Sequence, residues 1–360
     1  MAKVFVTGAT GQVGMHVVEY ILLNKKLGVT SPSDIICLVR NPKKAQALKQ
    51  MNVTIVKGEL QDSDTISEVM TNGIDFVFHV AANILLNQTY NQMYAPNVLG
   101  TRIMLDAFVK SQAKCIIYTS SIAVYEAFNG KKRYYNIDEN SPLGDLKGEP
   151  YQVTKRIAEN LVRDYAKKNP NKTIIITRLG PIIGAGDRQT IPAVVEVMKF
   201  RFLPKLINRG KHLFALTSAR DVARGQVFLA EYSGDISGEI YNIAHEPISY
   251  RRMMNVIADY YQKRQPKFSI TYWFFKSLLP LLRVLHKIFP TINLIKIALS
   301  PITVKYVGKT YIYNSEKLEK LGFEYKVTPE EAIIDTLVFL DPEKKMMKPS
   351  WRLKRKIKQN

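Results

Sequence analysis

A tyrosine and a lysine lie four residues apart at the start of a helical stretch, in EPYQVTKRIAEN at residues 149–160. At this spacing Tyr151 and Lys155 share one face of a helix, with their Cβ atoms about 6 Å apart. An ammonium group held near a phenol favours the phenolate and lowers the phenol pKa from its usual value of about 10. A tyrosine tuned in this way can exchange protons near neutral pH. The same spacing occurs twice more in the chain, so the surroundings of Tyr151 must decide its role.

A glycine-rich turn follows the first apolar run, in VFVTGATGQVG. Glycines at these positions let the backbone approach a pyrophosphate closely, and the start of the next helix offers free N–H groups to an anion. The turn has a strand before it and a helix after it, which is the context that such a motif requires. We expect a dinucleotide to bind along Gly8, Thr10, Gly11, Gln12, Val13 and Gly14.

The second apolar run ends in LVRNPKK, where the type of dinucleotide is usually decided. An acidic residue near this point binds the ribose 2′-hydroxyl of NAD. Here Arg40 takes that place and Lys44 follows one turn on, so the charges suit a 2′-phosphate. We therefore expect NADP(H) to be preferred, with NAD(H) as the alternative.

Elements that could position these residues alternate along the first half of the chain. Short apolar runs separate longer amphipathic ones, which predicts an α/β fold, a Rossmann-type doubly wound parallel sheet covered by helices on both faces. The expected strands are residues 3–7, 34–39, 53–57, 74–80, 114–119 and 173–178, and the expected helices include 13–27, 64–71, 95–111 and 150–168. We expect a nucleotide-binding domain at 1–185 with a returning piece near 218–245, a smaller substrate domain at 186–217 and 246–340, and a basic tail at 341–360.

The composition indicates a folded protein of a reducing compartment. Of the 360 residues 46% are hydrophobic and 10% aromatic, which excludes a disordered chain. The chain opens with a strand-like run and shows no signal peptide, so we expect a cytoplasmic location. Cys37 and Cys115 lie inside apolar runs and should be buried thiols, with neither a disulfide nor a metal site.

The net charge of +21 is concentrated in the last third of the chain. No acidic residue lies between Asp259 and Glu316, where nine Lys and Arg occur, and the stretch from Lys344 to Asn360 adds eight more. Such a regional excess indicates an anionic partner better than a general need for solubility. No recognition module for nucleic acid accompanies it, so we do not expect nucleic acid to bind.

Five motifs occur in the order found in the extended short-chain dehydrogenase/reductases. They are TGATGQVG, HVAA at 79–82, NVLGT at 97–101, YTSSIAVY at 118–125 and YQVTK at 151–155. The later RLGPIIGAGD, SARDVARG and NSEKLEKLGFEYKVTPEEAI are similar to C-terminal landmarks of that family, which extends the resemblance over about residues 1–340. The chain resembles this NAD-dependent epimerase/dehydratase superfamily, and in character it is closest to the 3β-hydroxysteroid dehydrogenase-like branch.

The resemblance implies roles for the tyrosine and the lysine. In this family the tyrosine exchanges the substrate proton, the lysine lowers its pKa and holds the nicotinamide ribose, and a serine binds the substrate oxygen. Tyr151 and Lys155 match the first two roles. Of the two serines in YTSSIAVY, Ser121 aligns with extended members better than Ser120, so Ser121 completes the expected catalytic group.

The resemblance also implies further cofactor contacts. They are Glu59, Leu60, Ala81, Ala82, Asn97, Thr119, Ser120, Leu179, Gly180, Pro181 and Ile182, together with Tyr151 and Lys155. Glu59 stands where the family usually has aspartate, and Leu179 where it usually has proline. Asn97 is expected to organise the sheet edge by hydrogen bonding, and His79 to be a core residue of the fourth strand.

Three functions remain open on the sequence. The apolar, aromatic segment 272–299 is similar to that of family members acting on steroids and other apolar alcohols, which favours an enzyme that interconverts a secondary alcohol and a ketone on a sterol-, steroid- or lipid-like substrate. A nucleotide-sugar epimerase or dehydratase is the first alternative, because its anionic substrate suits the basic region. An NADP(H)-sensing regulatory protein is the second, and the retained Tyr151 and Lys155 argue against it.

The segment 272–299 has two interpretations of its own. It forms core helices of the smaller domain, or it forms a lid that rests on an anionic membrane surface, where apolar side chains and cations bind together. It is too often interrupted by charge to span a membrane. The polar stretch 126–149 is expected to border the substrate entrance, and the resemblance implies a homodimer formed through helices 95–111 and 150–168.

Overall fold

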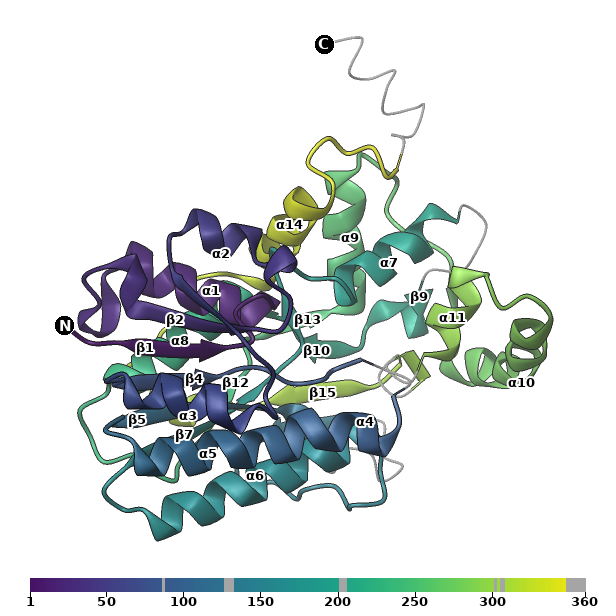
Figure 1. Cartoon of the computed structure of the whole chain (residues 1–360). Coiled ribbons are helices and arrows are strands. Elements are labelled where there is room, and N and C mark those ends of the chain that lie inside the picture. The colour runs from purple at the N-terminus through teal and green to yellow at the C-terminus, as the bar shows by residue number, and fades with distance from the viewer. Residues whose placement is uncertain (86–87, 126–132, 201–205, 301–302, 305–307, 348–360) are drawn as a thin grey trace.

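A seven-stranded parallel sheet forms the centre of the molecule (Figure 1). The computed structural model describes all residues except 86–87, 126–132, 201–205, 301–302, 305–307 and 348–360. The strands are β1 (Val4–Thr7), β2 (Ile35–Val39), β3 (Thr54–Lys57), β4 (Phe76–His79), β5 (Cys115–Ser121), β7 (Thr173–Leu179) and β12 (Ile240–Ile243). Their order is β12-β7-β5-β4-β1-β2-β3, and every neighbouring pair is parallel. The predicted doubly wound Rossmann-type fold is confirmed, and its order reverses between β1 and β4, where ligands bind at the carboxyl ends of such strands.

Helices cover both faces of this sheet because its strands bury alternate side chains on opposite sides. On β1, Val4 and Val6 join one hydrophobic cluster and Phe5 joins the other. The first cluster includes residues of α1 (Gln12–Leu23), α2 (Gln46–Gln50) and α8 (Ala219–Glu231), and the second includes residues of α3 (Ser63–Thr71), α5 (Gly100–Lys110) and α6 (Pro150–Lys168). In Figure 1, α5 and α6 lie side by side on the face opposite to α1.

A second group of elements lies beyond the carboxyl ends of the central strands (Figure 1). Its sheet has the order β13-β10-β15-β6. These strands are β6 (Arg133–Ile137), β10 (Leu213–Ala215), β13 (Pro247–Ser249) and β15 (Thr310–Tyr313), and two short pairs are formed by β8 (Ile182–Ile183) with β11 (Thr217–Ser218) and by β9 (Leu206–Ile207) with β14 (Ser269–Ile270). The helices are α7 (Thr190–Lys199), α9 (Tyr250–Tyr260), α10 (Tyr272–Ile288), α11 (Asn293–Leu299) and α14 (Pro329–Leu340). The short α13 (Glu316–Glu319) instead packs against the central sheet, where Leu318 joins the first hydrophobic cluster.

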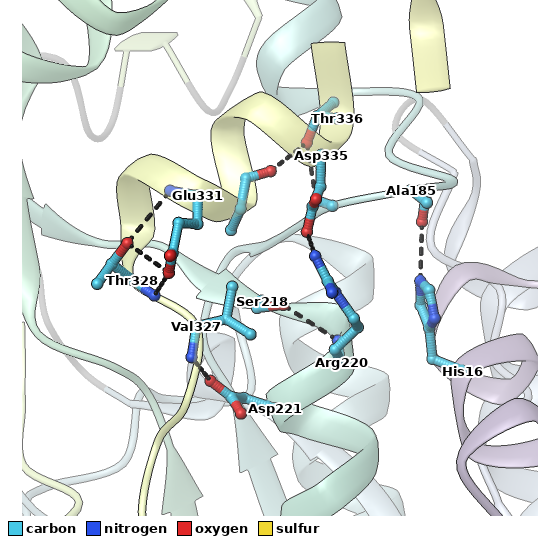
Figure 2. Close-up of polar contacts among 12 residues, drawn as sticks. His16, Ala185, Ser218, Arg220, Asp221, Val327, Thr328, Glu331, Asp335 and Thr336 are labelled. Carbon is cyan, nitrogen blue, oxygen red and sulfur yellow. Dashed lines mark hydrogen bonds and ion pairs between the residues drawn. The ribbon is translucent and has the colours of Figure 1, made fainter. Parts of the chain in front are cut away.

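Polar contacts fasten α14 to the part of the molecule that carries the central sheet (Figure 2). Arg220 of α8 forms an ion pair with Asp335, and the buried Asp221 accepts a hydrogen bond from the backbone N–H of Val327 at 2.8 Å. The hydroxyl of Thr336 accepts a hydrogen bond from the backbone N–H of Gly184 at 2.7 Å. The loop that follows β8 is therefore held by α14 from one side.

Several predicted boundaries differ from the structure for identifiable reasons. The helix expected at 13–27 ends at Leu23, because Lys25 and Leu27 adopt left-handed backbone angles and Glu231 of α8 binds the N–H of Leu27 at 2.9 Å. In the helix expected at 95–111, residues Ala95–Leu99 form a π-helical turn that continues α4 (Tyr90–Tyr94), and the α-helix α5 begins only at Gly100. Pro96 lies in that turn, and a proline cannot donate the backbone hydrogen bond that an α-helix needs.

The stretch 126–149, expected to be a loop, contains β6, which pairs with β15 in the second sheet. Residues 126–132 of that stretch lie outside the described part. The segment 272–299 forms α10 and α11, and only Phe275, Leu279 and Ile295 of these two helices are buried. Most of this segment is therefore surface and not core.

The two cysteines are buried and free, as predicted. Burial raises the pKa of both the Cys37 and the Cys115 thiol to about 12, so both are protonated and unreactive. Among the described residues, no helix has the length and the hydropathy needed to cross a membrane. No cluster of three or more His, Cys, Asp or Glu with a metal-binding arrangement occurs in the same part of the chain.

Candidate active site

The predicted serine and tyrosine meet where β5 ends and α6 begins. β5 is buried along its length until Ser121, which is half-buried at the carboxyl end. α6 begins at Pro150, a residue favoured at the first position of a helix because its missing N–H needs no partner there. Tyr151 follows, and its phenol lies close enough to the Ser121 side chain for that hydroxyl to lower the phenol pKa. The fold thus brings into contact two residues that the sequence predicts separately.

The lysine lies one helical turn further along α6 and is buried. Lys155 is 3% exposed, and its Nζ donates a hydrogen bond to the backbone carbonyl of Thr119 at 2.8 Å. The same Nζ lies 5.1 Å from the centre of the Tyr118 ring. These contacts hold the start of α6 against the end of β5.

Burial governs the protonation of Tyr151 and Lys155. It raises the pKa of Tyr151, and the hydrogen bond with Ser121 opposes that rise. It lowers the pKa of Lys155 to about 7, while the charge of Glu159 acts to raise it. The sequence predicts a lowered phenol pKa, and the structure differs because burial disfavours the phenolate more strongly than this hydrogen bond favours it. Tyr151 is therefore protonated at neutral pH, which is the form that donates a proton.

Ser120 has a different environment from Ser121, because successive side chains of a strand point to opposite faces. Ser120 is 2% exposed, and its hydroxyl donates a hydrogen bond to Oε2 of Glu159 at 2.7 Å. The hydroxyl of Ser120 is thus bonded within the protein interior and does not face the solvent. Ser121 remains the serine that we expect to face a substrate.

The glycine turn after β1 is shaped by close backbone approaches. Gly8 has a φ of +75°, and a Cβ at this position would lie 2.7 Å from the backbone nitrogen of Ala81. A Cβ on Gly14 would lie 2.4 Å from the carbonyl oxygen of Gly8. The helix α1 starts after Gly11 with no side chain capping it, so its first backbone N–H groups remain available to an anion. This cradle fits the pyrophosphate of a dinucleotide.

The side chains around this turn have distinct contacts. Gln12 donates a hydrogen bond to the carbonyl oxygen of Gly184 at 3.3 Å, so it connects α1 to the loop held by α14. His16 of α1 contacts the carbonyl oxygen of Ala185 in the same loop at 3.2 Å (Figure 2). Val13 is buried against the sheet, and Thr10 is exposed.

The residues expected near the adenosine end follow β2 and β3. Arg40 comes directly after β2 and is exposed, and Lys44 ends the exposed turn Pro42–Lys44. Within the described part of the chain neither forms an ion pair, so both cations are available to a ligand. Glu59 is exposed after β3, whereas Leu60 is buried. Leu60 packs directly on Gly100, and a Cβ added at position 100 would lie only 2.6 Å from Leu60 Cβ.

A chain of buried hydrogen bonds organises the edge of the sheet after β4. Asn97 accepts a hydrogen bond from the N–H of Asn83 at 2.7 Å and donates one to the hydroxyl of Thr154 on α6 at 3.1 Å. His79 contacts the hydroxyl of Thr7 at 3.0 Å, and burial lowers the pKa of its imidazole to about 3. Asn97 thus has the organising contacts that were predicted, and His79 is a neutral core residue. Ala81 and Ala82 lie half-buried in the segment between them.

The end of β7 and the residues that follow it lie beside the end of β5. Leu179 and Ser121 are register partners in the two parallel strands. Gly180 donates a hydrogen bond to the carbonyl of Ile243 on β12 at 3.1 Å, and the carbonyl of Pro181 accepts one from Thr217 at 2.9 Å. Ile182 then enters β8. These bonds place the segment Leu179–Ile182 next to the Ser121–Tyr151 contact, although the family's usual proline is absent.

Three buried polar residues of this region were not predicted. Gln226 of α8 donates hydrogen bonds to the hydroxyls of Thr119 and Thr177, at 2.8 and 2.9 Å. Glu159 and Arg178 form a buried ion pair with an N–O distance of 2.6 Å. These residues could have been found in the sequence as charged or amide side chains at otherwise apolar positions of a helix or strand. Such a side chain needs a polar partner when it is buried.

A Rossmann-type sheet with this glycine turn and a serine, a tyrosine and a lysine at one edge defines an NAD(P)-dependent enzyme of the extended short-chain dehydrogenase/reductase type. The chain belongs to the NAD dependent epimerase/dehydratase family, whose model matches residues 4–244. Similar curated proteins include "Sterol-4-alpha-carboxylate 3-dehydrogenase, decarboxylating" of Mus musculus, 26% identical over 344 residues that cover 93% of this chain and 90% of the relative.

Other similar proteins agree with that assignment. The "3beta-hydroxysteroid-dehydrogenase/decarboxylase isoform 2" of Arabidopsis thaliana is 26% identical over 92% of this chain, which spans 61% of that relative. Among solved structures, UDP-glucuronic acid 4-epimerase from Bacillus cereus in complex with NAD has a TM-score of 0.71 at 19% identity, with 94% of this chain and 96% of that chain covered. The dTDP-glucose 4,6-dehydratase from Bacillus anthracis in complex with NAD has a TM-score of 0.70 at 19% identity, with 96% and 98% covered. These two structures support the fold alone, and the family membership makes the chain an NAD(P)-dependent oxidoreductase.

Proposed function

We propose that this protein uses NADP(H) to interconvert a secondary alcohol and a ketone on a hydrophobic, sterol- or lipid-like substrate. The observation that carries the proposal is the contact between Ser121 and Tyr151, with Lys155 one turn further on, at the sheet edge that also carries the glycine turn. The nicotinamide, when bound, supplies or receives the hydride. Similarity to sterol dehydrogenases supports the choice of substrate class.

The proposed chemistry assigns each side chain one task at the substrate oxygen. Ser121 donates a hydrogen bond to that oxygen and holds it close to the Tyr151 phenol. Tyr151 donates its proton to the oxygen when a ketone is reduced and takes it back when the alcohol is oxidised. The ammonium of Lys155 stabilises the phenolate that reduction leaves behind and binds the nicotinamide ribose. Because burial raises the pKa of Tyr151, the phenol begins the reductive direction in the protonated state that this direction requires.

The test is NADP⁺ reduction by the purified protein with two panels of substrates, hydrophobic 3-hydroxysteroid-like alcohols and nucleotide sugars. Tyr151→Phe should lower kcat at least about 100-fold, because it removes the general acid and base, and should leave cofactor affinity nearly unchanged. Tyr165→Phe is a matched control on the same helix, since Tyr165 is bonded to Asp106 and lies away from Ser121. Substantial activity in Tyr151→Phe contradicts the assigned role. Conversion of a nucleotide sugar without net cofactor reduction would place the protein among the epimerases.

We propose a preference for NADP(H) over NAD(H) on the charges that follow β2. Arg40 and Lys44 are exposed there and have no ion-pair partner in the described structure, so they can bind a 2′-phosphate without losing another contact. Fluorescence titration should give a lower Kd for NADPH than for NADH. Equal or tighter binding of NADH contradicts the preference.

We further propose that α10 rests on an anionic membrane surface. Trp273, Leu281 and Ile288 of this helix are 60%, 56% and 61% exposed, and exposed cations at Lys276 and Lys287 lie among them. Apolar side chains and cations on one amphipathic helix suit the boundary between acyl chains and anionic headgroups. Two further proposals come from the sequence. The elements of 186–217 and 246–340 form the substrate domain, and α5 and α6 form the interface of a homodimer. Light scattering of the purified protein would test the dimer.

Sedimentation with vesicles tests the membrane proposal. The intact protein should bind phosphatidylserine vesicles at low salt and bind phosphatidylcholine vesicles weakly. Trp273→Ser with Ile288→Ser should weaken binding, whereas Phe339→Ser on α14, a residue that is also 57% exposed, should not. No binding of the intact protein to the anionic vesicles contradicts the proposal, and unchanged binding after removal of 344–360 would exclude only the tail.

A further inference from the structure

One buried carboxylate connects the three elements that carry the proposed catalytic residues. Glu159 lies one helical turn after Lys155 on α6 and is 1% exposed. Its Oε2 accepts hydrogen bonds from Ser120 Oγ at 2.7 Å and from Arg178 Nε at 3.1 Å, and its Oε1 accepts one from Arg178 NH2 at 2.6 Å. These three bonds cross-link α6, β5 and β7 through a single side chain.

Each partner of this carboxylate is the immediate neighbour of a residue of the site. Ser120 precedes Ser121, Arg178 precedes Leu179, and the register of β5 and β7 pairs Ser120 with Arg178 and Ser121 with Leu179. A displacement of Glu159 would therefore shift Ser121 and Leu179 relative to the helix that carries Tyr151. The partners are themselves fixed, because Arg178 is fully buried and lies 4.6 Å from the centre of the Tyr125 ring.

The charge of Glu159 also acts on Lys155. The titratable groups that act on Lys155 or contact it are Glu159 from α6, Tyr118 from β5 and His79 from β4. Burial keeps the rings neutral, since it raises the pKa of Tyr118 well above its usual value and lowers that of His79 to about 3. Among these groups Glu159 therefore supplies the negative charge, and it opposes the effect of burial on the ammonium.

We propose that Glu159 is a positioning residue of the oxidoreductase reaction, whose carboxylate fixes Ser121 and Leu179 against Tyr151 and whose charge stabilises the ammonium of Lys155. The geometry of the three bonds carries the first part, and the position of Glu159 next to Lys155 carries the second. This inference rests on the proposed function, in which Lys155 acts as an ammonium.

Kinetics as a function of pH separate the two parts. Glu159→Gln should lower kcat about ten- to a hundredfold through misplacement, with a smaller change in the KM for cofactor. It should also move the alkaline limb of the rate profile to lower pH by about one unit, because loss of the neighbouring anion favours neutral lysine. Ser120→Ala removes one bond and keeps the charge, so it should lower kcat without moving the limb, and Glu159→Asp should keep the limb near that of the wild type. Glu330→Gln is the matched control, since Glu330 pairs with Arg252 on the exposed surface, and it should change neither quantity.

A second readout requires no turnover and so distinguishes failure of this inference from failure of the proposed function. The difference in unfolding free energy between wild type and Lys155→Met, measured by urea denaturation across pH, follows the titration of Lys155 in the folded protein. The same difference measured in the Glu159→Gln background should begin to rise at lower pH. If Glu159→Gln fails to fold because Arg178 is left unpaired, the double variant Glu159→Gln/Arg178→Gln removes both charges and serves as the background.

The outcomes divide cleanly. A shift of both the rate profile and the difference curve to lower pH supports the proposal, and a shift of the difference curve alone supports the electrostatic part in a protein whose reaction was assigned wrongly. An unmoved difference curve overturns the electrostatic part. A rate profile in Ser120→Ala that moves as far as in Glu159→Gln overturns it as well, and unchanged kcat in Glu159→Gln overturns the positioning part.

Discussion

Gly14→Ala tests whether the glycine turn is a close-fitting cradle for a dinucleotide. A Cβ at position 14 would lie 2.4 Å from the oxygen and 2.7 Å from the carbon of the Gly8 carbonyl, and 2.9 Å from Cα of Ala9. All three atoms belong to the backbone, so no side-chain rotation can relieve the contact. Ordinary contacts begin about 1 Å further out, and α1 must therefore move away from the turn by a comparable distance.

Two opposing effects determine the stability of this variant. Overpacking of a tight site costs about 1–3 kcal/mol, whereas alanine in a helix is favoured over glycine by about 1 kcal/mol. The net loss of unfolding free energy should thus be at most about 2 kcal/mol, and the protein should still fold. Cofactor affinity should suffer more, because the N–H groups at the start of α1 and the backbone of the turn must meet the same pyrophosphate. We expect the Kd for NADPH to rise at least about tenfold.

Titration of NADPH fluorescence with purified wild type and variant measures this effect. Gly225→Ala is the matched control, because it is the same substitution in a helix of the same layer. Its Cβ would meet the ends of side chains and no backbone atom, the nearest being Ile243 Cδ1 at 3.2 Å. It should leave the Kd unchanged. A folded Gly14→Ala protein whose Kd lies within twofold of the wild type would refute the idea that this turn binds the pyrophosphate.

Three further changes probe other parts of the molecule. Lys155→Met should remove a pH dependence of stability, because the pKa of Lys155 is lowered to about 7 in the folded protein. Between that pH and the usual lysine pKa of about 10 the unfolded chain binds more protons, so the unfolding free energy of the wild type should rise relative to the variant by up to about 1.4 kcal/mol per pH unit. A difference between the two proteins that does not change with pH would contradict this prediction. Arg40→Asp should raise the Kd for NADPH at least about tenfold and leave that for NADH nearly unchanged, and equal changes for both would show that Arg40 does not meet the 2′-phosphate. Thr336→Val should lower the unfolding free energy by about 1–3 kcal/mol, because it leaves the buried N–H of Gly184 without its acceptor; unchanged stability in urea denaturation would mean that this contact contributes little.

The order of elements in the central sheet was predictable because it depends on local patterns. Fully apolar strands such as Ile35–Val39 can only be buried on both faces, and amphipathic helices between them must cover those faces. The helix Pro150–Lys168 was predicted with both ends correct, since Pro150 and Asn169 mark them. Predicted helix ends were wrong where a residue far away in the sequence binds the backbone. An example is Leu27, whose N–H donates a hydrogen bond to Glu231.

The candidate site was predictable as a set of residue types and only partly as a geometry. Ser121, Tyr151 and Lys155 follow from motif and spacing. The hydroxyl of Ser120 is hydrogen-bonded to Glu159 and is therefore unavailable to a substrate. This bond could not be predicted, because it joins a strand and a helix that meet only in the folded chain. The raised pKa of Tyr151 has the same origin, because burial is a property of everything packed around the phenol.

The sequence by itself determined the class of fold, the glycine turn with its helix, the free buried cysteines and the pairing of a tyrosine with a lysine on one helix face. These depend on contacts between residues close in the chain, or on hydrophobic periodicity, and both can be read locally. Only the tertiary structure decided that Ser120 is bonded to Glu159, which carboxylate neighbours Lys155, and that most of α10 lies at the surface. The physical reason is that burial, charge and hydrogen-bond partners depend on what surrounds each group, and those surroundings come from segments far apart in the chain.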